Sequence, residues 1–297
     1  MDLEPLDCLI IGGGAAGLVA ATYLGRYRRR ACVVDAGASR LAKIPRSRNV
    51  PGFPDGIAGS ELLQRLQRQA TQFGVPIASA GIDTLEREGE LFTARAGERE
   101  WRARFVLLAT GACDVEPRLP GLDEGLAAGN VRYCPVCDGY ETQGRRVAVL
   151  GRGSHGLREA LFVAGFGNEV TWLSLETQRD VASPELARLR EQGVRIAERV
   201  PTAMRCVPRQ GIEVEVHEGE RLHFDVLYPA LGLTHASELA TRLGAKAQDD
   251  GQLEVDAHMQ TTVDRLYAAG DVAVDLNQIS VAAGHAAIAA TAIHNRL

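Results

Sequence analysis

The sequence lacks the features that would mark a small secreted scaffold, a disordered chain or a polyanion-binding protein. Only 6 of its 297 residues are cysteine, which excludes a fold held together mainly by disulfides. Its 33 basic and 38 acidic residues give a net charge of −5, so composition offers no electrostatic reason to expect nucleic acid or an anionic membrane as a partner. The hydrophobic content of 45% excludes intrinsic disorder, and the length favours two domains.

Signals for export and for membrane insertion are missing as well. The first seven residues contain three acids and no base, whereas a secretory signal peptide begins with basic residues. Residues 8–25 carry no charge, but three consecutive glycines interrupt them, and a bilayer span needs about 20 predominantly apolar residues. We therefore expect a cytoplasmic protein with no membrane partner, in a compartment where paired cysteines are more often catalytic or metal-binding than structural.

Glycine is the residue type in excess, with 32 copies, and it concentrates in two turns. In the first, an apolar strand at residues 9–11 leads directly into the glycine-rich run at residues 12–17. A helical pattern follows, and the next apolar strand, at residues 31–34, ends in Asp35. This arrangement is a G-x-G-x-x-G pattern between a strand and a helix, with an acid 23 residues beyond the first glycine.

Each residue of this pattern has a physical role in binding a dinucleotide. Gly12 makes the tight turn, Gly14 lets a pyrophosphate approach the backbone, and Gly17 lets helix and strand pack closely. The helix N-terminus presents unpaired N–H groups to the phosphates, and Asp35 accepts hydrogen bonds from an adenosine ribose. The residues that we expect to contact the cofactor here are Gly12, Gly14, Ala15, Ala16, Gly17, Asp35 and Ala36.

The same pattern occurs again 139 positions further on, which indicates a duplicated Rossmann-type unit. The second unit differs at two places: a bulky arginine enters its turn, and Ser174 replaces the ribose-binding acid, with Glu176 two residues later. Two interpretations remain open, a working nucleotide site and a retained scaffold whose ligand is lost or changed. The candidate residues of this second site are Gly151, Arg152, Gly153, Ser154, His155, Gly156, Ser174 and Glu176.

Two further segments fit the first unit. A buried strand at residues 105–109 ends in Thr110 and Gly111, and another at residues 266–269 ends in Gly270 and Asp271. These segments resemble the ATG and GD motifs of FAD-containing pyridine-nucleotide disulfide oxidoreductases. The resemblance implies that Asp271 hydrogen-bonds the ribityl and phosphate region of FAD.

Because the GD motif lies so far down the chain, the first domain is expected to be discontinuous. We predict an α/β fold with two Rossmann-like three-layer domains, the second inserted into the first. Residues 1–115 and 247–297 would form the FAD-binding domain, and residues 116–246 an NAD(P)-binding-like domain. Pro and Gly residues near the first crossing and a Gln-Asp-Asp-Gly turn at the second mark the boundaries.

Cys134 and Cys137 form the only C-x-x-C pair, and three interpretations of it compete. A zinc site needs four ligands, but the sequence has no second C-x-x-C and no close histidine pair, so we predict no metal. A structural or accidental pair remains possible, because this spacing arises by chance. A redox role is favoured, since such a pair cycles between dithiol and disulfide and Asp138 beside it can supply or remove the proton.

Residues 134–141, which read Cys-Pro-Val-Cys-Asp-Gly-Tyr-Glu, precede the second glycine turn and resemble the active-site element of low-molecular-weight thioredoxin reductases. Together with both glycine turns, the ATG and GD motifs and the last helix, the resemblance covers essentially the whole chain. It implies a homodimer with one tightly bound FAD per subunit. It also implies electron flow from NADPH through flavin and disulfide to a thioredoxin-like protein or a small disulfide or dithiol substrate.

The resemblance also implies roles for individual residues. Cys137 would lie against the flavin, Cys134 would attack the external substrate, and Asp138 would act as acid and base. The helix that starts after Gln278 would direct its N-terminus at the flavin and stabilise the reduced ring. The residues that the resemblance adds to the predicted cofactor site are Asn49, Thr110, Gly111, Asp271, Gln278 and Ile279.

One departure from the family concerns the electron donor. Members that use NADPH carry a His-Arg-Arg run where this chain has Ser174, Leu175 and Glu176, so the guanidinium fork for a 2′-phosphate is missing. Three outcomes stay open: NADH with Glu176 on its ribose, weakly bound NADPH, and no nicotinamide at all.

In the third case the enzyme would take electrons from ferredoxin or another flavin, or pass them to oxygen. Oxygen is the acceptor of the gliotoxin- and holomycin-type dithiol oxidases, whose C-x-x-C-H-G-Y-E motif differs from this one at Asp138. Two further alternatives are a flavin-containing redox sensor without turnover and a flavin monooxygenase-like protein with an incidental cysteine pair.

Overall fold

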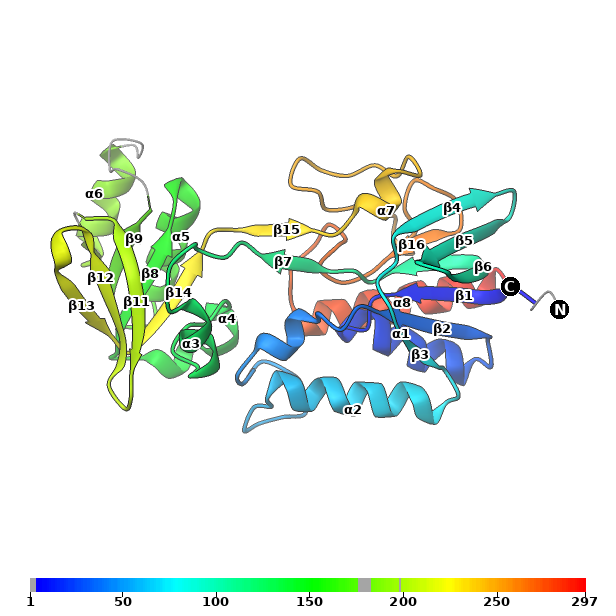
Figure 1. Ribbon diagram of the computed structural model, residues 1–297, viewed down its shortest axis with the longest axis horizontal. Coiled ribbons are helices and arrows are strands. Elements are labelled where there is room, and N and C mark those ends of the chain that lie inside the picture. The colour runs from blue at the N-terminus through cyan, green and yellow to red at the C-terminus, as the bar shows by residue number, and fades with distance from the viewer. Residues whose placement is uncertain (1–3, 176–182, 198) are drawn as a thin grey trace.

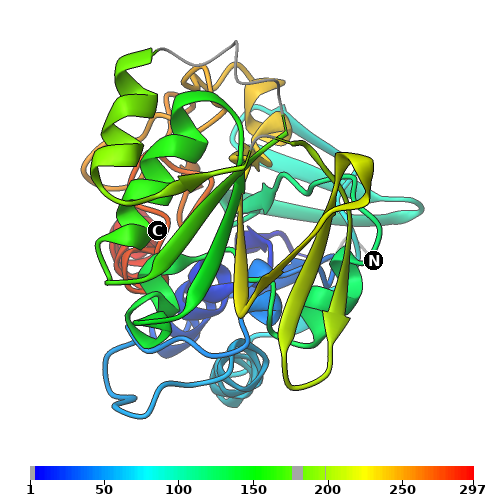
Figure 2. The same ribbon diagram turned by 90° about the vertical axis from the view of Figure 1, so that its left-hand side faces the viewer.

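A computed structural model describes residues 4–175, 183–197 and 199–297 of the chain. Its sheets form two groups along the long axis of the molecule, and a two-stranded ribbon connects them (Figure 1). Seen end on, the smaller group has parallel strands between two helices on one side and a three-stranded antiparallel sheet on the other (Figure 2). Within the described ranges, every helix is too short or too polar to cross a membrane.

The larger sheet is parallel at its centre and antiparallel at one edge. Its strand order is β3-β2-β1-β6-β5-β4, and β16 pairs with β6. Neighbours among β3, β2, β1, β6 and β16 run parallel, whereas β4, β5 and β6 form an antiparallel meander. The strands are β1 (Leu6–Ile11), β2 (Ala31–Asp35), β3 (Ile77–Ser79), β4 (Thr84–Glu88), β5 (Leu91–Ala96), β6 (Arg99–Leu108) and β16 (Leu266–Ala268).

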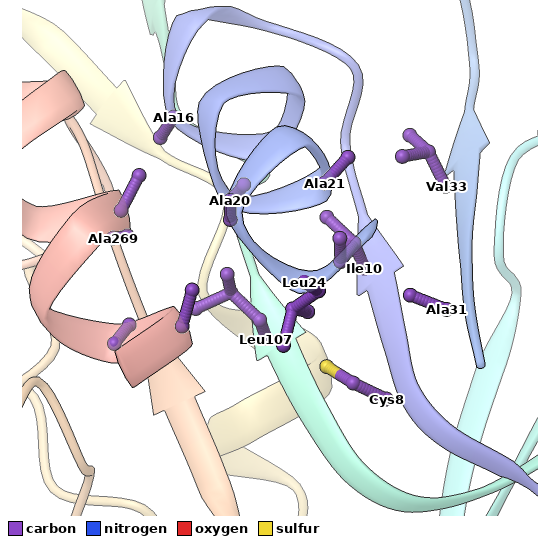
Figure 3. Close-up of a cluster of buried hydrophobic side chains, with 14 of the residues drawn as sticks. Cys8, Ile10, Ala16, Ala20, Ala21, Leu24, Ala31, Val33, Leu107 and Ala269 are labelled. Atoms are coloured by element: carbon purple, nitrogen blue, oxygen red, sulfur yellow. The ribbon is translucent and has the colours of Figure 1, made fainter. Parts of the chain in front are cut away.

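Both faces of this sheet are covered, which explains why its central strands are continuously apolar rather than alternating. Successive residues of β1 point to opposite faces. Cys8 and Ile10 pack with the helices on one face (Figure 3), whereas Leu9, Ile11 and Cys32 pack in a second cluster on the other. Cys8 and Cys32 are therefore small core residues. The helices of this part are α1 (Ala15–Arg26), α2 (Gly59–Gln72) and α8 (Ile279–Asn295).

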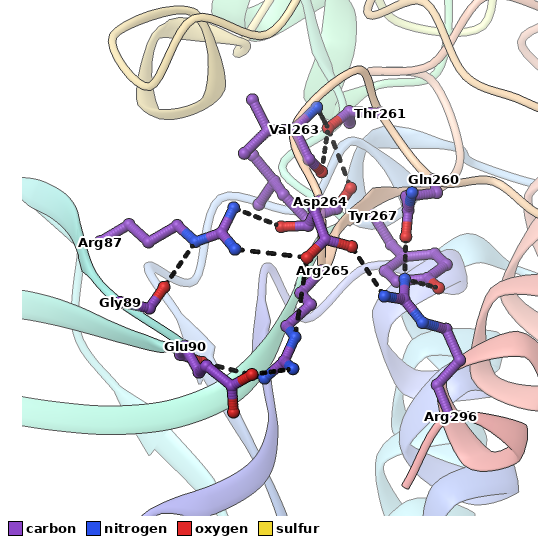
Figure 4. Close-up of polar contacts among 11 residues, drawn as sticks. Arg87, Gly89, Glu90, Gln260, Thr261, Val263, Asp264, Arg265, Tyr267 and Arg296 are labelled. Atoms are coloured by element: carbon purple, nitrogen blue, oxygen red, sulfur yellow. Dashed lines mark hydrogen bonds and ion pairs between the residues drawn. The ribbon is translucent and has the colours of Figure 1, made fainter.

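A charged network fixes the C-terminal end of α8 to the larger sheet (Figure 4). Arg296 donates to Asp264 Oδ1 at 2.7 Å and to the hydroxyl of Tyr267, on β16, at 3.3 Å. Arg265, beside Asp264, contacts Glu90 at 2.7 Å. The opposite end of α8, at Ile279, lies at the carboxyl ends of the parallel strands.

The smaller group has a four-stranded parallel sheet of order β10-β9-β8-β14 and an antiparallel sheet of β11, β12 and β13. One face of the parallel sheet packs against α5 and α6, and the other packs against the antiparallel sheet and α3. The elements are α3 (Leu122–Ala127), β8 (Arg146–Gly151), α5 (Gly153–Ala164), β9 (Glu169–Ser174), α6 (Ser183–Glu191), β10 (Arg195–Ile196), β11 (Pro201–Val207), β12 (Gly211–Val216), the 3-10 helix η4 (His217–Gly219), β13 (Arg221–Phe224) and β14 (Val226–Ala230).

The ribbon between the two groups consists of β7 (Ala112–Asp114) and β15 (Leu233–His235), which pair antiparallel. The helix α7 (Glu238–Thr241) follows β15, and its Ala240, like Ala245, packs in the core of the larger sheet. The sequence places the return crossing near residue 247. We propose that the domain boundary lies earlier, at β15, because residues after this strand already share the core of the larger sheet.

Candidate active site

A cavity of about 410 Å³ opens where the parallel strands of the larger sheet end, the usual place for a ligand in an α/β sheet. Residues from the glycine turn, from both motif segments and from the C-x-x-C segment line it together. Two predicted residues lie outside this lining: Gly17, buried in α1, and Asn49, in the loop before α2. The predicted residues that line it are Gly12, Gly14, Ala15, Ala16, Asp35, Ala36, Thr110, Gly111, Cys134, Cys137, Asp138, Asp271, Gln278 and Ile279.

The first glycine turn needs glycine at its first and last positions because of the backbone packed against them. Gly12 has a φ of +108°, and a Cβ atom there would lie 2.2 Å from the carbonyl oxygen of Ala109. A Cβ atom on Gly17 would lie 1.9 Å from the carbonyl oxygen of Gly12. Strand and helix can therefore approach this closely only when both residues lack a side chain.

Gly14 is different, because protein packing does not require it. The nearest described atom to a Cβ at Gly14 is Ser39 Oγ at 3.4 Å, an ordinary contact distance. A glycine at this place on the cavity wall leaves room for a ligand that touches the backbone. Asp35 is already oriented at the end of β2, since its Oδ1 accepts a hydrogen bond from Gly13 N at 3.0 Å.

The cysteine pair forms a disulfide on a short helical turn at the cavity wall. Cys134 precedes α4 (Pro135–Asp138), and its Sγ is bonded to Cys137 Sγ. Proline occupies the first position of this helix, where its fixed φ and missing N–H are tolerated. Cys137 is 7% exposed, whereas Val136 between the two cysteines is 51% exposed. The disulfide therefore faces the cavity while the outer edge of the turn faces solvent.

Contacts from the loop before α2 and from the start of α8 hold this turn in place. Arg48 N donates to the carbonyl oxygen of Cys137 at 3.3 Å, and Asn49 Nδ2 donates to that of Val136 at 3.3 Å. Asn49 Nδ2 also donates to Gln278 Oε1 at 2.8 Å, and Gln278 Nε2 lies 3.9 Å from Cys134 Sγ. Gln278 directly precedes α8, so the helix N-terminus and the disulfide meet at one end of the cavity.

Asp138 is buried behind the disulfide, with 6% of its surface exposed. Its Oδ1 accepts a hydrogen bond from the Tyr228 hydroxyl at 2.7 Å, and its Oδ2 accepts one from Arg132 Nη1 at 3.3 Å. Burial raises the pKa of this carboxyl group, and the hydrogen bond from Tyr228 and the charge of Arg132 partly oppose that rise. A carboxyl group with a raised pKa, beside a disulfide, is suited to exchange protons near neutral pH.

The comparison with known proteins agrees with this geometry. The sequence profile described as pyridine nucleotide-disulphide oxidoreductase matches residues 6–286. The chain belongs to that family. It is 30% identical to the thioredoxin reductase of Treponema pallidum, over 96% of this chain and 95% of the relative.

Solved structures of thioredoxin reductases also resemble the oxidoreductase over nearly its whole length. The thioredoxin reductase of Streptococcus pyogenes superimposes with a TM-score of 0.89 at 26% identity, over 98% of this chain and 97% of the other. A protein named HlmI superimposes with a TM-score of 0.88 at 27% identity, over 98% and 92%. The predicted fold class, the resemblance to low-molecular-weight thioredoxin reductases and the enzyme class, an FAD-dependent thiol–disulfide oxidoreductase, are confirmed.

The second glycine turn of the oxidoreductase uses its first and last glycines as the first turn does. A Cβ atom on Gly151 would lie 2.6 Å from Gly156 Cα, so this pair is required by the packing of β8 against α5 alone. Ser154 Oγ contacts Glu185 Oε2 of α6 at 3.2 Å, which places an acid beside the turn.

The other described residues of the predicted second site lie where β9 ends and α5 begins. Burial and then the nearby Arg158 lower the pKa of His155, which favours the neutral form of its imidazole. Arg152 directly precedes α5, Gly153 has a φ of +47°, and Ser174 is buried at the end of β9. Glu176 lies outside the described residues. A nucleotide at this turn therefore stays a prediction.

Two residues that the sequence did not single out shape the cavity of the oxidoreductase. Arg40, in the 3-10 helix η1 (Arg40–Lys43), donates to both oxygens of Asp114 at 2.7–3.1 Å and to Asp271 Oδ2 at 3.1 Å. Burial lowers the pKa of Arg40, but the bonds and charges of the two acids outweigh burial and raise it. Arg40 thereby orients Asp271 at the cavity wall. No motif indicates this, since the three residues lie far apart in the sequence.

Replacing Arg40 with methionine leaves the buried carboxylate of Asp114 without its cation. We expect the free energy of unfolding to fall by about 1–3 kcal/mol, less than for a fully buried pair because Arg40 is partly exposed. We also expect faster release of FAD, because Asp271 loses its orientation. Denaturant unfolding and the flavin content after gel filtration measure the two effects. Arg95→Met is the control, since Arg95 also contacts two carboxylates but its side chain and both partners are largely exposed to solvent. Equal losses in both variants would contradict this account.

Proposed function

We propose that the protein transfers electrons between FAD, the Cys134–Cys137 disulfide and an external thiol or disulfide substrate. The observation that carries the proposal is that the disulfide lines the same cavity as the glycine turn and Asp271. A disulfide kept only for stability has no reason to face a dinucleotide cavity. A monooxygenase-like protein with an incidental pair would not need the buried acid behind it.

The residues at the cavity fit FAD. Gly14 leaves room at the backbone, α1 begins there with Ala15 and without an acidic side chain, and Asp35 and Asp271 offer carboxylates for ribose and ribityl hydroxyls. We propose that Thr110, Gly111, Gln278 and Ile279 complete the wall. Bound FAD would supply a two-electron carrier beside the disulfide.

The chain's own residues account for the exchange with an external disulfide. The Cys134 thiolate attacks one sulfur of the substrate, the substrate S–S bond breaks, and the sulfur that leaves takes a proton. The Cys137 thiolate then attacks Cys134 Sγ, which re-forms the protein disulfide and releases the second substrate sulfur, also as a thiol. Two electrons and two protons pass from the dithiol to the substrate. Asp138 gives and receives the protons, because it is buried beside both cysteines with a raised pKa.

The substrate, assembly and location are proposed from the relatives. Relatives over nearly the whole chain are named thioredoxin reductases, so a thioredoxin-like protein is the first candidate substrate and a small disulfide or dithiol the second. We propose a cytoplasmic homodimer on the same ground. Steady-state turnover of a disulfide substrate distinguishes this enzyme from a flavin-containing redox sensor, which would undergo one oxidation without turnover.

The electron donor is the part of the proposal in which this chain departs from the family. We expect NADPH to bleach the flavin band no faster than NADH, because no arginine fork follows β9 and Glu185 places an acid at the second turn. Anaerobic mixing of the holoprotein with each nucleotide, followed at the visible flavin band, measures the two rates. Faster bleaching by NADPH would contradict the prediction.

A second candidate is favoured by the same observations: a nicotinamide-independent enzyme. Such an enzyme would take electrons from ferredoxin or a flavin, or would pass them from a dithiol to oxygen. If neither nucleotide bleaches the flavin, a dithiol that bleaches it and oxygen consumption in air would select the dithiol oxidase.

A further inference from the structure

The carboxyl group of Asp138 is held by two side chains, one from the same segment of the chain and one from a distant strand. Tyr228 lies on β14, ninety positions beyond Asp138, and its hydroxyl donates to Oδ1 at 2.7 Å. Arg132 lies six positions before Asp138 and donates from Nη1 to Oδ2 at 3.3 Å, while its Nε donates to the carbonyl oxygen of Gly129 at 2.9 Å. Each carboxyl oxygen therefore has its own donor.

We propose that Tyr228 and Arg132 are positioning residues that fix the orientation of the Asp138 carboxyl group and hold its charge inside the disulfide site. The inference rests on the proposed function, in which Asp138 exchanges protons with the cysteine thiols. Without these donors, the carboxyl group would be buried with unpaired oxygens, an arrangement that disfavours its charged form.

The surroundings of Asp138 explain why two donors are needed. Burial raises the pKa of Asp138, and Glu141, in the 3-10 helix η2 (Tyr140–Thr142) that follows α4, raises it further. Tyr228 and Arg132 act in the opposite direction. Glu141 is itself paired with Arg48, whose Nε lies 3.4 Å from Glu141 Oε1. The balance between these groups keeps the carboxyl group able to take either protonation state during exchange.

Tyr228 is suited to this role because its buried environment favours the protonated hydroxyl, which can donate a hydrogen bond. It is 1% exposed, and burial together with the charge of Asp138 raises its pKa. Arg132 supplies a permanent charge at the other oxygen, since a guanidinium does not lose its proton in this range. Substituting Tyr228 removes the uncharged donor, and substituting Arg132 removes the charged one, so the two hydrogen bonds can be tested separately.

The test is the pH dependence of disulfide exchange in single turnover. Holoprotein is reduced with one equivalent of dithiothreitol under argon, which opens the disulfide and leaves the flavin oxidised, then freed of reductant and mixed with hydroxyethyl disulfide between pH 5.5 and 8.5. N-ethylmaleimide quenching and mass spectrometry count the remaining thiols of Cys134 and Cys137. Asp138→Asn identifies the limb of the pH–rate profile that belongs to Asp138, since this variant cannot titrate there.

Tyr228→Phe and Arg132→Gln are expected to move that limb to higher pH, because each loses a donor to the charged form of Asp138. At a pH well along the limb, the rate should differ from wild type by roughly tenfold, the least that removing a hydrogen bond to a charged group should give. Arg132→Lys keeps a cation and should restore part of the shift. Tyr267→Phe is the matched control, a buried tyrosine that loses a contact with Arg296 outside the cavity lining.

The outcomes distinguish the positioning role of Tyr228 and Arg132 from the acid–base role of Asp138. A limb that stays in place in Tyr228→Phe and Arg132→Gln, even with a slower rate, overturns the positioning role. A limb that persists in Asp138→Asn overturns the acid–base role in the proposed function, and the positioning role with it. If Tyr228→Phe does not fold, Arg132→Gln and Arg132→Lys decide the question, since Arg132 is partly exposed.

Discussion

Cys137→Ser protein is expected to keep FAD and to lose dithiol-driven reduction of the flavin by at least about a thousandfold. Cys137 is buried in the cavity wall and, with Cys134, forms the redox disulfide, whereas the glycine turn belongs to a separate part of the chain. A serine hydroxyl of the same size cannot form or break a disulfide. Stopped-flow mixing with dithiothreitol under argon measures the rate of bleaching, and the flavin-to-protein absorbance ratio measures retention.

The same variant is expected to react once with an external disulfide and to stop. Cys134 still attacks the substrate, but no second thiol resolves the mixed disulfide, so mass spectrometry should find half of the substrate attached to Cys134. Cys206→Ser is the matched control, because Cys206 is a free cysteine on β11 in the smaller group of sheets. Unchanged turnover in Cys137→Ser would show that the pair is incidental.

Gly17→Ala is expected to destabilise the protein by about 3 kcal/mol and to weaken FAD binding by at least about tenfold. The added Cβ atom would lie 1.9 Å from the carbonyl oxygen of Gly12, a backbone atom that cannot turn away. The strand–helix turn must therefore open, which displaces Gly12 and Gly14 at the cavity wall. Chemical denaturation of the apoprotein and fluorescence titration with FAD measure the two losses.

Gly284→Ala is the control for this substitution. Gly284 also lies within a helix, α8, but a Cβ atom there meets no described atom within 4 Å beyond its own neighbourhood. The alanine should therefore leave FAD binding unchanged and stabilise the helix by about 0.5–1 kcal/mol. Equal losses in both variants would mean that the close approach at Gly17 does not shape the cavity.

The parts of the site that lie next to each other in the sequence could be predicted from it. The turn between β1 and α1 is local, and its glycines have steric reasons that any strand–turn–helix of this kind imposes. The spacing of Cys134 and Cys137 is also local, and the single turn α4 is enough to bring the two sulfurs together. The repeat of the glycine pattern is visible in the sequence itself, and it predicts two units of similar fold.

The parts that depend on tertiary packing could not be predicted. In the sequence, Tyr228 is indistinguishable from the other residues of an apolar strand. Its hydroxyl reaches Asp138 only because β14 pairs with β8. Arg40 and Asp114 meet because η1 and β7 both border the cavity, and no spacing rule links them. The proposed boundary at β15 has the same origin, since the position of α7 on the larger sheet follows from its packing and not from a turn signal.

The most direct test of the central claim, that flavin and disulfide form one redox unit, is an anaerobic titration of wild-type holoprotein with dithiothreitol. The visible flavin band and the number of protein thiols are followed together. The account predicts that one dithiol equivalent opens the Cys134–Cys137 disulfide and that further dithiol bleaches the flavin through it. Complete opening of the disulfide with no change in the flavin band, even with excess dithiol, would contradict the account.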